Sequence, residues 1–278
     1  MDREWEALAA WYDARQGDTG DLWHRALIDP GLLAVLGPVR GLELLDLACG
    51  NGYLSRRFAR EGARVTGVDA SAPIVRLARA RERRAPLGVR YLVADAARLD
   101  ALADGRFDIV VSNMALMDIR GADRAIAEVG RLLRPSGRFV FSICHPCFDV
   151  MSRSAWEIER GFRSEVVWRK VQRYREPYEE LCPWKVGEKE YRAVPGFHRP
   201  LAWYVRALRA AGLVIEAFEE PAPGPEMFPG SPQAPYLAEV PLHCVIGARR
   251  TGGPGATDAG PARVGPRAAR RARGTAPR

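Results

Sequence analysis

Apolar residues in the first half of the chain follow two alternating patterns. Short runs rich in Val, Ile and Leu show no polar alternation, which suits strands buried on both faces. Between these runs apolar residues recur at helical spacing, so that Ile126, Val129 and Leu133 share one face. The predicted strands are 43–48, 64–69, 89–93, 107–112 and 138–144, and the predicted helices are 53–60, 72–82 and 121–133. Strands that alternate with helices indicate a parallel sheet covered on both faces, hence a doubly wound α/β fold.

This regular pattern stops after the fifth predicted strand. The sequence RPSG at 134–137 predicts a turn that ends the preceding helix, because Pro135 and Gly137 do not continue a helix cheaply. Residues 146–197 then hold nine of the 24 aromatic residues, among many Arg and Glu. A long segment without regular structure is unusual in a compact domain unless it forms a lid or a binding element. We therefore expect an aromatic-rich lid after the fifth strand.

Regular spacing returns near the end. Residues 198–212 predict a helix with Pro200 in its first turn and Gly212 just past its end. Residues 213–220 and 239–250 predict two strands that pair antiparallel across a short connection, which makes a mostly parallel seven-stranded sheet. The predicted divisions are a helical cap (1–40), an α/β core (41–145), the lid (146–197), the closing helix and strands (198–250) and a basic tail (251–278).

Composition narrows the class of protein. No run approaches the ~18 apolar residues of a membrane span, the start MDREWEALAAWYD is acidic rather than a leader, and five scattered cysteines do not form a disulfide framework. We expect a cytoplasmic protein with no membrane contact. The net charge of +8 falls mostly in the tail, which has six Arg and one Asp and should be disordered. Weak nucleic-acid affinity through the tail is the alternative to a functionless one.

The stretch LLDLACGNGYLS at 44–55 places a glycine-rich turn between a buried strand and a helix, the usual nucleotide site of such sheets. A mononucleotide P-loop is excluded because the stretch has no Lys. A dinucleotide fingerprint needs a third glycine where Ser55 stands, so the loop alone does not decide between a dinucleotide and an adenosyl cofactor.

Acidic residues at successive strand ends favour the adenosyl cofactor. Asp46 lies in the first strand, Asp69 ends the second and can accept from ribose hydroxyls, and Asp95 follows the third, near where an adenine amine would lie. This acidic rim repels a pyrophosphate but suits a ligand that carries an ammonium and a sulfonium.

The motifs LLDLACGNGYLS, VTGVDAS, VADAARL, FDIVVSNMALMDI and LLRPSGRFVFSICHP resemble, in order and spacing, those of class I S-adenosylmethionine-dependent methyltransferases, in particular the type 11 group that acts on small molecules. The resemblance covers roughly residues 1–250 and implies a Rossmann-like methyltransferase fold. It implies the following cofactor contacts: Asp46, Gly50, Asn51 and Gly52 around the methionine moiety, Asp69 on the ribose, Ala70, Ser71, Asp95 and Ala96 around the adenine, and Ser112, Asn113 and Met114 beneath the sulfonium.

The segment 11–25 also resembles the part that closes over this cofactor, and Tyr12 is the candidate contact, although the aromatic residues there could equally pack on the domain. One departure from the family is Ala48, where the first loop glycine usually stands. We expect ordinary strand dihedrals there, which Ala tolerates. Cys49 is expected to be a small buried filler.

Two histidines are candidate catalytic residues. His145 ends the fifth strand within CHPC, and His198 precedes the closing helix. Each could deprotonate or orient an acceptor, and each could equally order a loop. Cys144 and Cys147 have CxxC spacing, but a structural zinc site needs four ligands and no second pair exists, so no metal is predicted.

The sequence therefore predicts methyl transfer to an O or N atom of a small molecule, with S-adenosylmethionine as the cofactor. Aromatic residues of the lid favour a planar or hydrophobic acceptor, an Arg there could clamp a carboxylate, and Tyr191 and Trp203 are the predicted pocket residues. A nicotinamide oxidoreductase on the same fold and a non-catalytic scaffold are the alternatives. A nucleic-acid methyltransferase is disfavoured, because no Asn-Pro-Pro-Tyr type motif follows the fourth strand and the folded part is barely basic.

Overall fold

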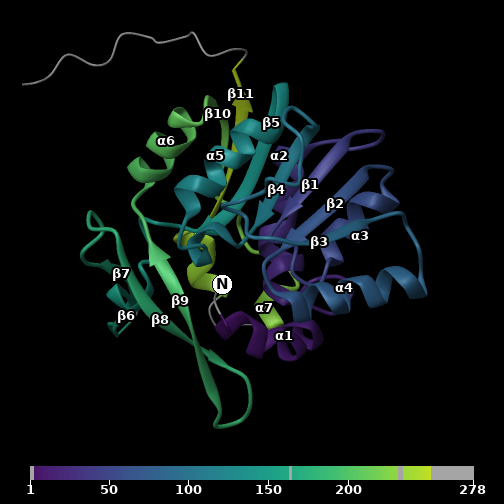
Figure 1. The fold of residues 1–278 in the computed structure, drawn as a ribbon. Coiled ribbons are helices and arrows are strands. Elements are labelled where there is room, and N and C mark those ends of the chain that lie inside the picture. Colours follow the sequence, from purple (N-terminus) through teal and green to yellow (C-terminus); the bar gives the residue numbers. More distant parts are fainter. Residues whose placement is uncertain (1–2, 163–164, 231–233, 252–278) are drawn as a thin grey trace, which may run out of the picture.

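The computed structural model describes residues 3–162, 165–230 and 234–251. A seven-stranded sheet has the order β10-β11-β5-β4-β1-β2-β3. Its strands are β1 (Glu43–Leu47), β2 (Arg64–Asp69), β3 (Arg90–Val93), β4 (Phe107–Asn113), β5 (Leu133–Cys144), β10 (Leu213–Glu219) and β11 (His243–Arg250). The first five are parallel, and β11 runs antiparallel to both β5 and β10. The predicted mostly parallel, doubly wound sheet is confirmed (Figure 1).

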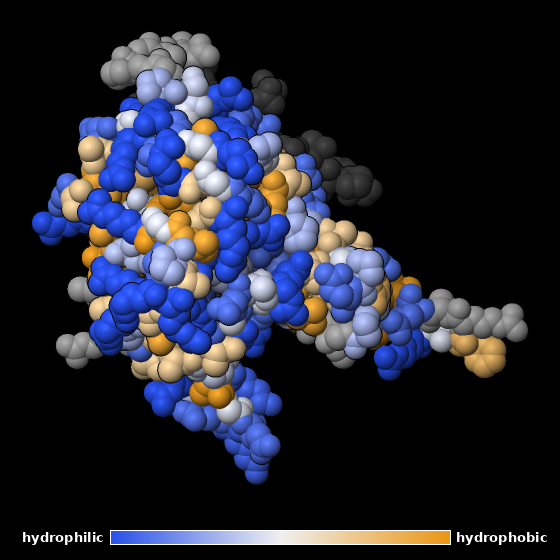
Figure 2. Space-filling view, turned by 90° about the vertical axis from the view of Figure 1, so that its right-hand side faces the viewer, coloured by the Kyte–Doolittle hydropathy of each residue, from blue (hydrophilic) through white to orange (hydrophobic). Residues whose placement is uncertain are grey.

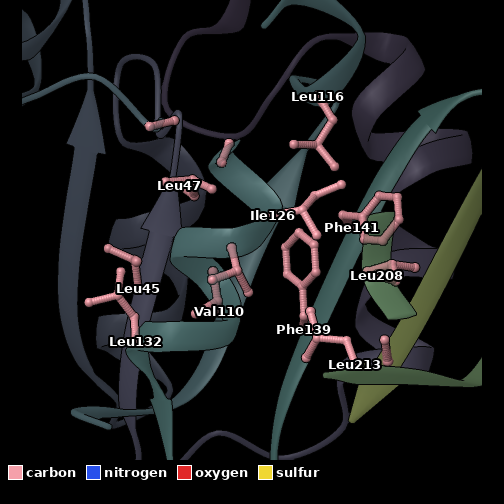
Figure 3. Close-up of a cluster of buried hydrophobic side chains, with 14 of the residues drawn as sticks. Leu45, Leu47, Val110, Leu116, Ile126, Leu132, Phe139, Phe141, Leu208 and Leu213 are labelled. Atoms are coloured by element: carbon pink, nitrogen blue, oxygen red, sulfur yellow. The ribbon is translucent and has the colours of Figure 1, made fainter. Parts of the chain in front are cut away.

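Helices cover both faces of this sheet. On one face lie α5 (Ala122–Leu132) and α6 (Leu201–Ala210), and on the other lie α2 (Asp29–Leu36), α3 (Tyr53–Arg60) and α4 (Ala72–Arg84). Figure 3 shows Ile126 of α5 packed in one layer with Val110 of β4 and Phe141 of β5. Each such side chain contributes about 1.5–3 kcal/mol by leaving water, so the sheet is a rigid base for the loops at its edge.

The segment RPSG at 134–137 ends helix α5 as predicted but lies inside β5 rather than in a separate turn. Leu133 pairs with Phe107 and Arg138 with Ile109, so four residues of β5 stand opposite Asp108 alone. Ser136 has a left-handed φ of 64° in this bulge. The strand therefore starts earlier than the apolar pattern indicates, and its first part bends out of the ladder.

The insertion after β5 is not irregular, contrary to the sequence-based expectation. It forms two antiparallel hairpins, β6 (Ser154–Arg160) with β7 (Glu165–Val171) and β8 (Tyr178–Lys185) with β9 (Tyr191–His198), after a short 3₁₀ turn η3 (Met151–Arg153). Narrow projections stand out from the body in Figures 1 and 2, and β8–β9 reaches the bottom of Figure 1. The face seen in Figure 2 is mostly hydrophilic with scattered apolar residues.

The closing elements differ in detail from the prediction. Pro200 is the N-cap of α6 rather than part of its first turn, while Gly212 lies just past the helix with φ 72°. The link between β10 and β11 is longer than expected, because it contains α7 (Met227–Gly230) and α8 (Ala234–Glu239), and β11 begins only at His243.

The N-terminal part consists of α1 (Arg3–Gln16), a π-helical turn η1 (His24–Ile28) and α2. In Figure 1, α1 lies below the same end of the sheet as the β8–β9 hairpin. Across the described ranges, no helix is long and apolar enough to cross a membrane. Of the predicted basic tail, only Thr251 is among the described residues.

Candidate active site

A cavity of about 950 Å³ lies at the carboxyl ends of the parallel strands, the usual ligand position in open α/β sheets. Its wall is built by α1, by the loops after β1, β2, β3, β4 and β5, and by the two hairpins of the insertion. The predicted site residues in this wall are Tyr12, Gly50, Asp69, Ala70, Ser71, Asp95, Ala96, Asn113, Met114 and His198. Those outside it are Asp46, Asn51, Gly52, Ser112, His145, Tyr191 and Trp203.

The glycine-rich loop folds back sharply between β1 and α3. Gly50 and Gly52 have left-handed φ values of 54° and 78°. Ala48 also has a left-handed φ, 60°, so the expectation of ordinary strand dihedrals there is wrong. An L-residue in this conformation costs roughly 1–2 kcal/mol, so Ala48 carries strain that the family's usual glycine avoids. A Cβ at Gly50 would lie 3.1 Å from the Tyr12 ring, so a larger residue there would press on that ring.

Asp69 joins this loop to the end of β2. Its Oδ2 accepts from the N–H of Gly50 at 2.9 Å, and its Oδ1 accepts from the N–H of Ser71 at 2.9 Å. Burial raises the pKa of Asp69, while both hydrogen bonds act in the opposite direction. A carboxylate offers about four acceptor positions, so positions remain for the two hydroxyls of a ribose.

Asp46 lies behind the cavity wall, where it accepts from Ser55 Oγ at 2.5 Å. Burial raises the pKa of Asp46 to about 7, and the nearby Asp69 adds to the shift. Ser55, which stands where a dinucleotide fingerprint needs glycine, thus ties α3 to the first strand. Asp46 therefore supports the start of α3, which follows the glycine-rich loop, and does not line the cavity itself.

Asn51 and α4 fasten the N-terminal helix to the same loop. The Asn51 amide donates to Asp13 Oδ1 at 3.1 Å and to the Gly17 carbonyl at 2.8 Å. Arg81 of α4 donates to Asp13 and, at 2.9 Å, to Asp18 Oδ1. These contacts set the position of Tyr12, whose pKa is raised by burial and then by Asp69. Sequence analysis missed Asp13 and Arg81, which lie 68 residues apart.

The region predicted to bind adenine is more open. Asp95 is exposed and accepts from the N–H of Ala97 at 2.8 Å, which shapes the loop after β3. Ser71 caps α4 by accepting from the N–H of Ile74, and Ala96 is buried beside it in the wall. The exposed carboxylate of Asp95 keeps acceptor positions for an exocyclic amine.

The end of β4 is held by a buried polar network. The Asn113 amide donates to Asp29 Oδ1 and to the Tyr53 hydroxyl, each at 3.0 Å, while Asn113 Oδ1 accepts from Ser142 Oγ at 2.5 Å. The next residue, Met114, has a left-handed φ of 51°. The network therefore links the cap, α3, β4 and β5 directly beneath the cavity. Ser112 Oγ is buried without a hydrogen-bond partner among the described residues.

The two candidate histidines have different environments. His145 is 2% exposed, its Nδ1 accepts from the N–H of Cys147 at 3.1 Å, and its Nε2 donates to Glu220 at 2.8 Å. Burial lowers the pKa of His145. With both nitrogens used and no place in the wall, this geometry favours the loop-ordering alternative. His198 does line the cavity and donates from Nε2 to the Tyr174 carbonyl at 2.8 Å, which leaves the lone pair on Nδ1.

Neither predicted pocket residue reaches the cavity wall. Tyr191 is 61% exposed at the start of β9, and Trp203 packs in α6 against Tyr204. The aromatic residues that do line the wall are Trp5, Tyr12, Trp23, Trp156, Trp184, Phe197 and Tyr204. Trp184 of β8 lies 5.8 Å, between ring centroids, from both Trp5 and Trp11 of α1. The second hairpin therefore closes against the N-terminal helix above the cavity.

The sequence analysis expected an Arg of the insertion to serve the pocket but named neither Arg169 nor Asp118, both of which line the cavity. Arg169 lies over the Trp156 ring, donates to the Phe148 carbonyl at 2.7 Å and contacts Asp149 at 3.5 Å. Asp118 lines the cavity from η2 (Leu116–Asp118), and burial raises the pKa of its carboxyl to about 7. Asp118 is the second Asp of the motif FDIVVSNMALMDI. An acidic residue in this otherwise apolar stretch was the sequence signal that could have identified it.

The cysteines of CHPC are free thiols. Within the described part of the chain, no group of three or more His, Cys, Asp or Glu side chains is placed to hold a metal ion. Cys49 is buried against the loop, as expected of a small filler.

Comparison with known proteins identifies the family. Residues 45–141 match the model of a methyltransferase domain. A solved S-adenosylmethionine-dependent methyltransferase from Mesorhizobium loti is 30% identical, with a TM-score of 0.65, and the match covers 80% of this chain and 96% of that one. This chain belongs to the class I S-adenosylmethionine-dependent methyltransferases. The family resemblance seen in the motifs is thereby confirmed, and S-adenosylmethionine is the cofactor of this family.

Curated methyltransferases match over a shorter length. Malonyl-[acyl-carrier protein] O-methyltransferase of Pseudescherichia vulneris is 37% identical over 111 residues, 40% of this chain and 42% of that protein. Ubiquinone biosynthesis O-methyltransferase of Coxiella burnetii is 32% identical over 147 residues, 49% and 61% of the respective chains. The methyltransferase described here therefore spans about half the length of the curated relatives it matches.

The residues of this methyltransferase fit the cofactor. Gly50 leaves room beneath Tyr12, the Asp69 carboxylate faces the same space, and the cavity is large enough for a ligand of that size with volume to spare. The acidic wall suits a cationic sulfonium better than a pyrophosphate.

Proposed function

We propose that the protein transfers a methyl group from S-adenosylmethionine to an O or N atom of a small molecule held beneath the hairpins of residues 146–197. The observation that carries the proposal is the continuity of one cavity, whose wall runs from Gly50 and Asp69 at the glycine-rich loop to Trp156 and Phe197 in the insertion. One continuous space of about 950 Å³ accommodates a donor and an acceptor together.

In this proposal the two ends of the cavity have separate roles. Residues 1–40 form a cap over the cofactor, the segment 41–145 with 198–250 forms the core, and 146–197 forms the lid. Trp156 and Phe197 favour an aromatic or otherwise hydrophobic acceptor, because flat apolar walls exclude water and stack on planar groups.

When bound, the cofactor supplies a methyl group already activated on a positively charged sulfur. The protein then has to align the acceptor in line with that group and exclude water. Alignment alone can supply ~7–11 kcal/mol in favourable systems. Asp69 and the loop at Gly50 hold the nucleoside end, while contact of Trp184 with Trp5 closes the cavity above it.

A general base adds roughly 10²–10⁴-fold when the acceptor must lose a proton. His198 lines the cavity and uses Nε2 on the Tyr174 carbonyl, so Nδ1 is its candidate atom for proton transfer or acceptor orientation. His145 orders the loop after β5 through Glu220 and Cys147. We expect His145→Gln to lower stability and His198→Gln to lower turnover more than stability.

Differential scanning fluorimetry tests the cofactor part of the proposal. S-adenosylmethionine and S-adenosylhomocysteine should raise the melting temperature, whereas NAD should not. A screen of small acceptors with a labelled methyl donor then tests transfer. A shift with NAD alone would support the nicotinamide oxidoreductase, an alternative that the comparisons do not favour. Adenosyl binding with no labelled product from any hydroxyl or amine acceptor would support the scaffold.

A further inference from the structure

Asp118 differs from the other aspartates of the cavity wall. Four of them accept hydrogen bonds from named partners: Asp21 from His24, Asp69 from Gly50, Asp95 from Ala97 and Asp149 from Arg169. The Asp118 side chain accepts no hydrogen bond from any other described residue, although it is partly buried. Burial of a carboxylate without donors is costly, so the acceptor positions of Asp118 are open to a hydrogen-bond donor of a ligand in the cavity.

Asp118 shares its cavity with residues of the N-terminal helix and of the insertion. On the cofactor side its charge adds to the rise in the pKa of Tyr12, after burial and other acidic residues. On the insertion side it adds to the rise in the pKa of Cys144 and, after burial, of Cys182 to about 11. Tyr12 of α1, Cys144 of β5 and Cys182 of β8 line the same cavity as Asp118, so residues of all three elements share this space with its carboxylate.

The backbone that carries Asp118 is held rigidly by Arg199. The guanidinium donates to the carbonyl oxygens of Leu116 at 3.0 Å and Ile119 at 2.7 Å, and to that of Arg120 at 3.0 Å. The rings of Phe197 and Trp203 flank it, at 5.0 and 4.8 Å. The N–H groups of Arg199 are used on these carbonyl oxygens. Arg199 therefore acts on Asp118 through its charge and donates no hydrogen bond to the Asp118 carboxylate.

We propose that Asp118 is the group that binds the reacting end of the acceptor, an O–H or N–H, beside the transferable methyl group. This inference rests on the proposed function and narrows its substrate class to acceptors whose reacting atom carries a hydrogen, and it disfavours a carboxylate acceptor, which Asp118 would repel. The proton passes from the acceptor atom to Asp118 Oδ, and the freed lone pair forms the new bond to the methyl carbon. The electron pair of the broken carbon–sulfur bond stays on sulfur, which becomes neutral.

The test compares two adenosyl ligands by calorimetry. Sinefungin carries a primary amine on carbon in place of the methylsulfonium, whereas S-adenosylhomocysteine has a neutral thioether sulfur there and no donor. In the wild type, we expect Asp118 to make sinefungin the tighter ligand. Asp118→Asn should reduce that preference about tenfold, because a charge-assisted hydrogen bond is lost, and should change the Kd for S-adenosylhomocysteine less than threefold. Asp123→Asn, an exposed carboxylate in the first turn of α5, is the matched control and should behave as the wild type.

The outcomes separate the two proposals. If the wild type binds neither ligand, the proposed function fails. If both bind and Asp118→Asn keeps the preference for sinefungin, the proposed function stands and the role of Asp118 is overturned. Should Asp118→Asn not fold, as judged by circular dichroism, Asp118→Ala takes its place with the same expected loss.

Discussion

The Asp69 carboxylate and the backbone N–H of Gly50 are joined by a 2.9 Å hydrogen bond across the carboxyl ends of β2 and β1. The bond holds the glycine-rich loop in position, and the same carboxylate faces the cavity. Asp69→Ala should therefore both release the loop and remove the ribose acceptor. We expect S-adenosylhomocysteine affinity to fall by more than tenfold in calorimetry. Asp108→Ala, at the opposite end of the sheet beside Arg134, should leave affinity unchanged.

Gly50→Ala tests the close approach of Tyr12. The substitution combines a left-handed φ of 54° with a Cβ only 3.1 Å from the ring, so it should displace the cap and weaken S-adenosylhomocysteine binding about tenfold. Gly41→Ala is the control, because its φ is 78° but nothing lies within 4 Å of the added Cβ. It should cost a similar ~1–2 kcal/mol of stability without loss of affinity. Equal losses of affinity in both variants would contradict the role given to Tyr12.

Ala48→Gly should stabilise the protein. Relief of the left-handed conformation is worth ~1–2 kcal/mol, and the extra chain entropy of glycine takes back ~0.5–1 kcal/mol, so the expected net gain is about 1 kcal/mol in the free energy of unfolding. Urea denaturation measures it. Ala59→Gly, in the regular helix α3, should lose roughly 1 kcal/mol instead. A loss in both variants would show that Ala48 is not strained.

The stability of the protein should respond to the ionisation of Asp118. Folding raises the pKa of this carboxyl from 3.8 to about 7, chiefly by burial. Its contribution to stability is therefore complete below pH 3.8 and is lost as the pH rises through 7. Asp118→Asn lacks this loss, so it should gain stability relative to the wild type by up to ~1.4 kcal/mol per pH unit between those values.

Chemical denaturation at pH 5 and pH 8 measures that difference. The groups that act on Asp118 or are acted on by it are Arg199, Tyr12, Cys144 and Cys182. The pKa values of Tyr12, Cys144 and Cys182 are raised, so these three stay neutral between pH 5 and pH 8. A stability difference between Asp118→Asn and the wild type that is the same at both pH values would contradict the prediction.

The contact between the second hairpin and α1 should govern access to the cofactor. Trp184→Ala removes both ring contacts with α1, each worth about 0.5–1.5 kcal/mol. We expect faster hydrogen exchange in α1 and a several-fold weaker affinity for S-adenosylhomocysteine. Trp168→Ala, a half-exposed ring on β7 outside the cavity wall, is the matched control. If hydrogen exchange in α1 is equally slow in both variants, the packing of the second hairpin on α1 does not depend on Trp184.

Local signals in the sequence account for the sheet and for the part of the cavity wall that the loops after β1, β2 and β3 form. Buried strands have uninterrupted apolar runs, and acids at their ends, such as Asp69, fall at one edge because parallel strands end together. The hairpins of 146–197 were missed because β6, β7 and β8 have no uninterrupted run of buried apolar residues, and these strands depend on cross-strand partners beyond the local window.

The part of the cavity wall formed by the insertion and by the turn at Asp118 depends on contacts between residues far apart in the sequence, which no local pattern encodes. Arg199 reaches carbonyl groups about 80 residues earlier in the chain, and Trp184 reaches α1. The left-handed backbone of Ala48 was also missed, since alanine gives no sign of a conformation that its Cβ opposes.

The three hydrogen bonds from Arg199 to carbonyl oxygens of residues 116–120 limit how the second hairpin can move. Arg199 directly follows the last residue of β9, His198, so the second hairpin and the turn that carries Asp118 share one anchor. An outward movement of the hairpin must either break the three hydrogen bonds of Arg199 or move the turn that carries Asp118 as well. Under the proposed function, entry of the acceptor and placement of the Asp118 carboxylate would therefore be coupled, because one arginine fixes both the hairpin and the turn.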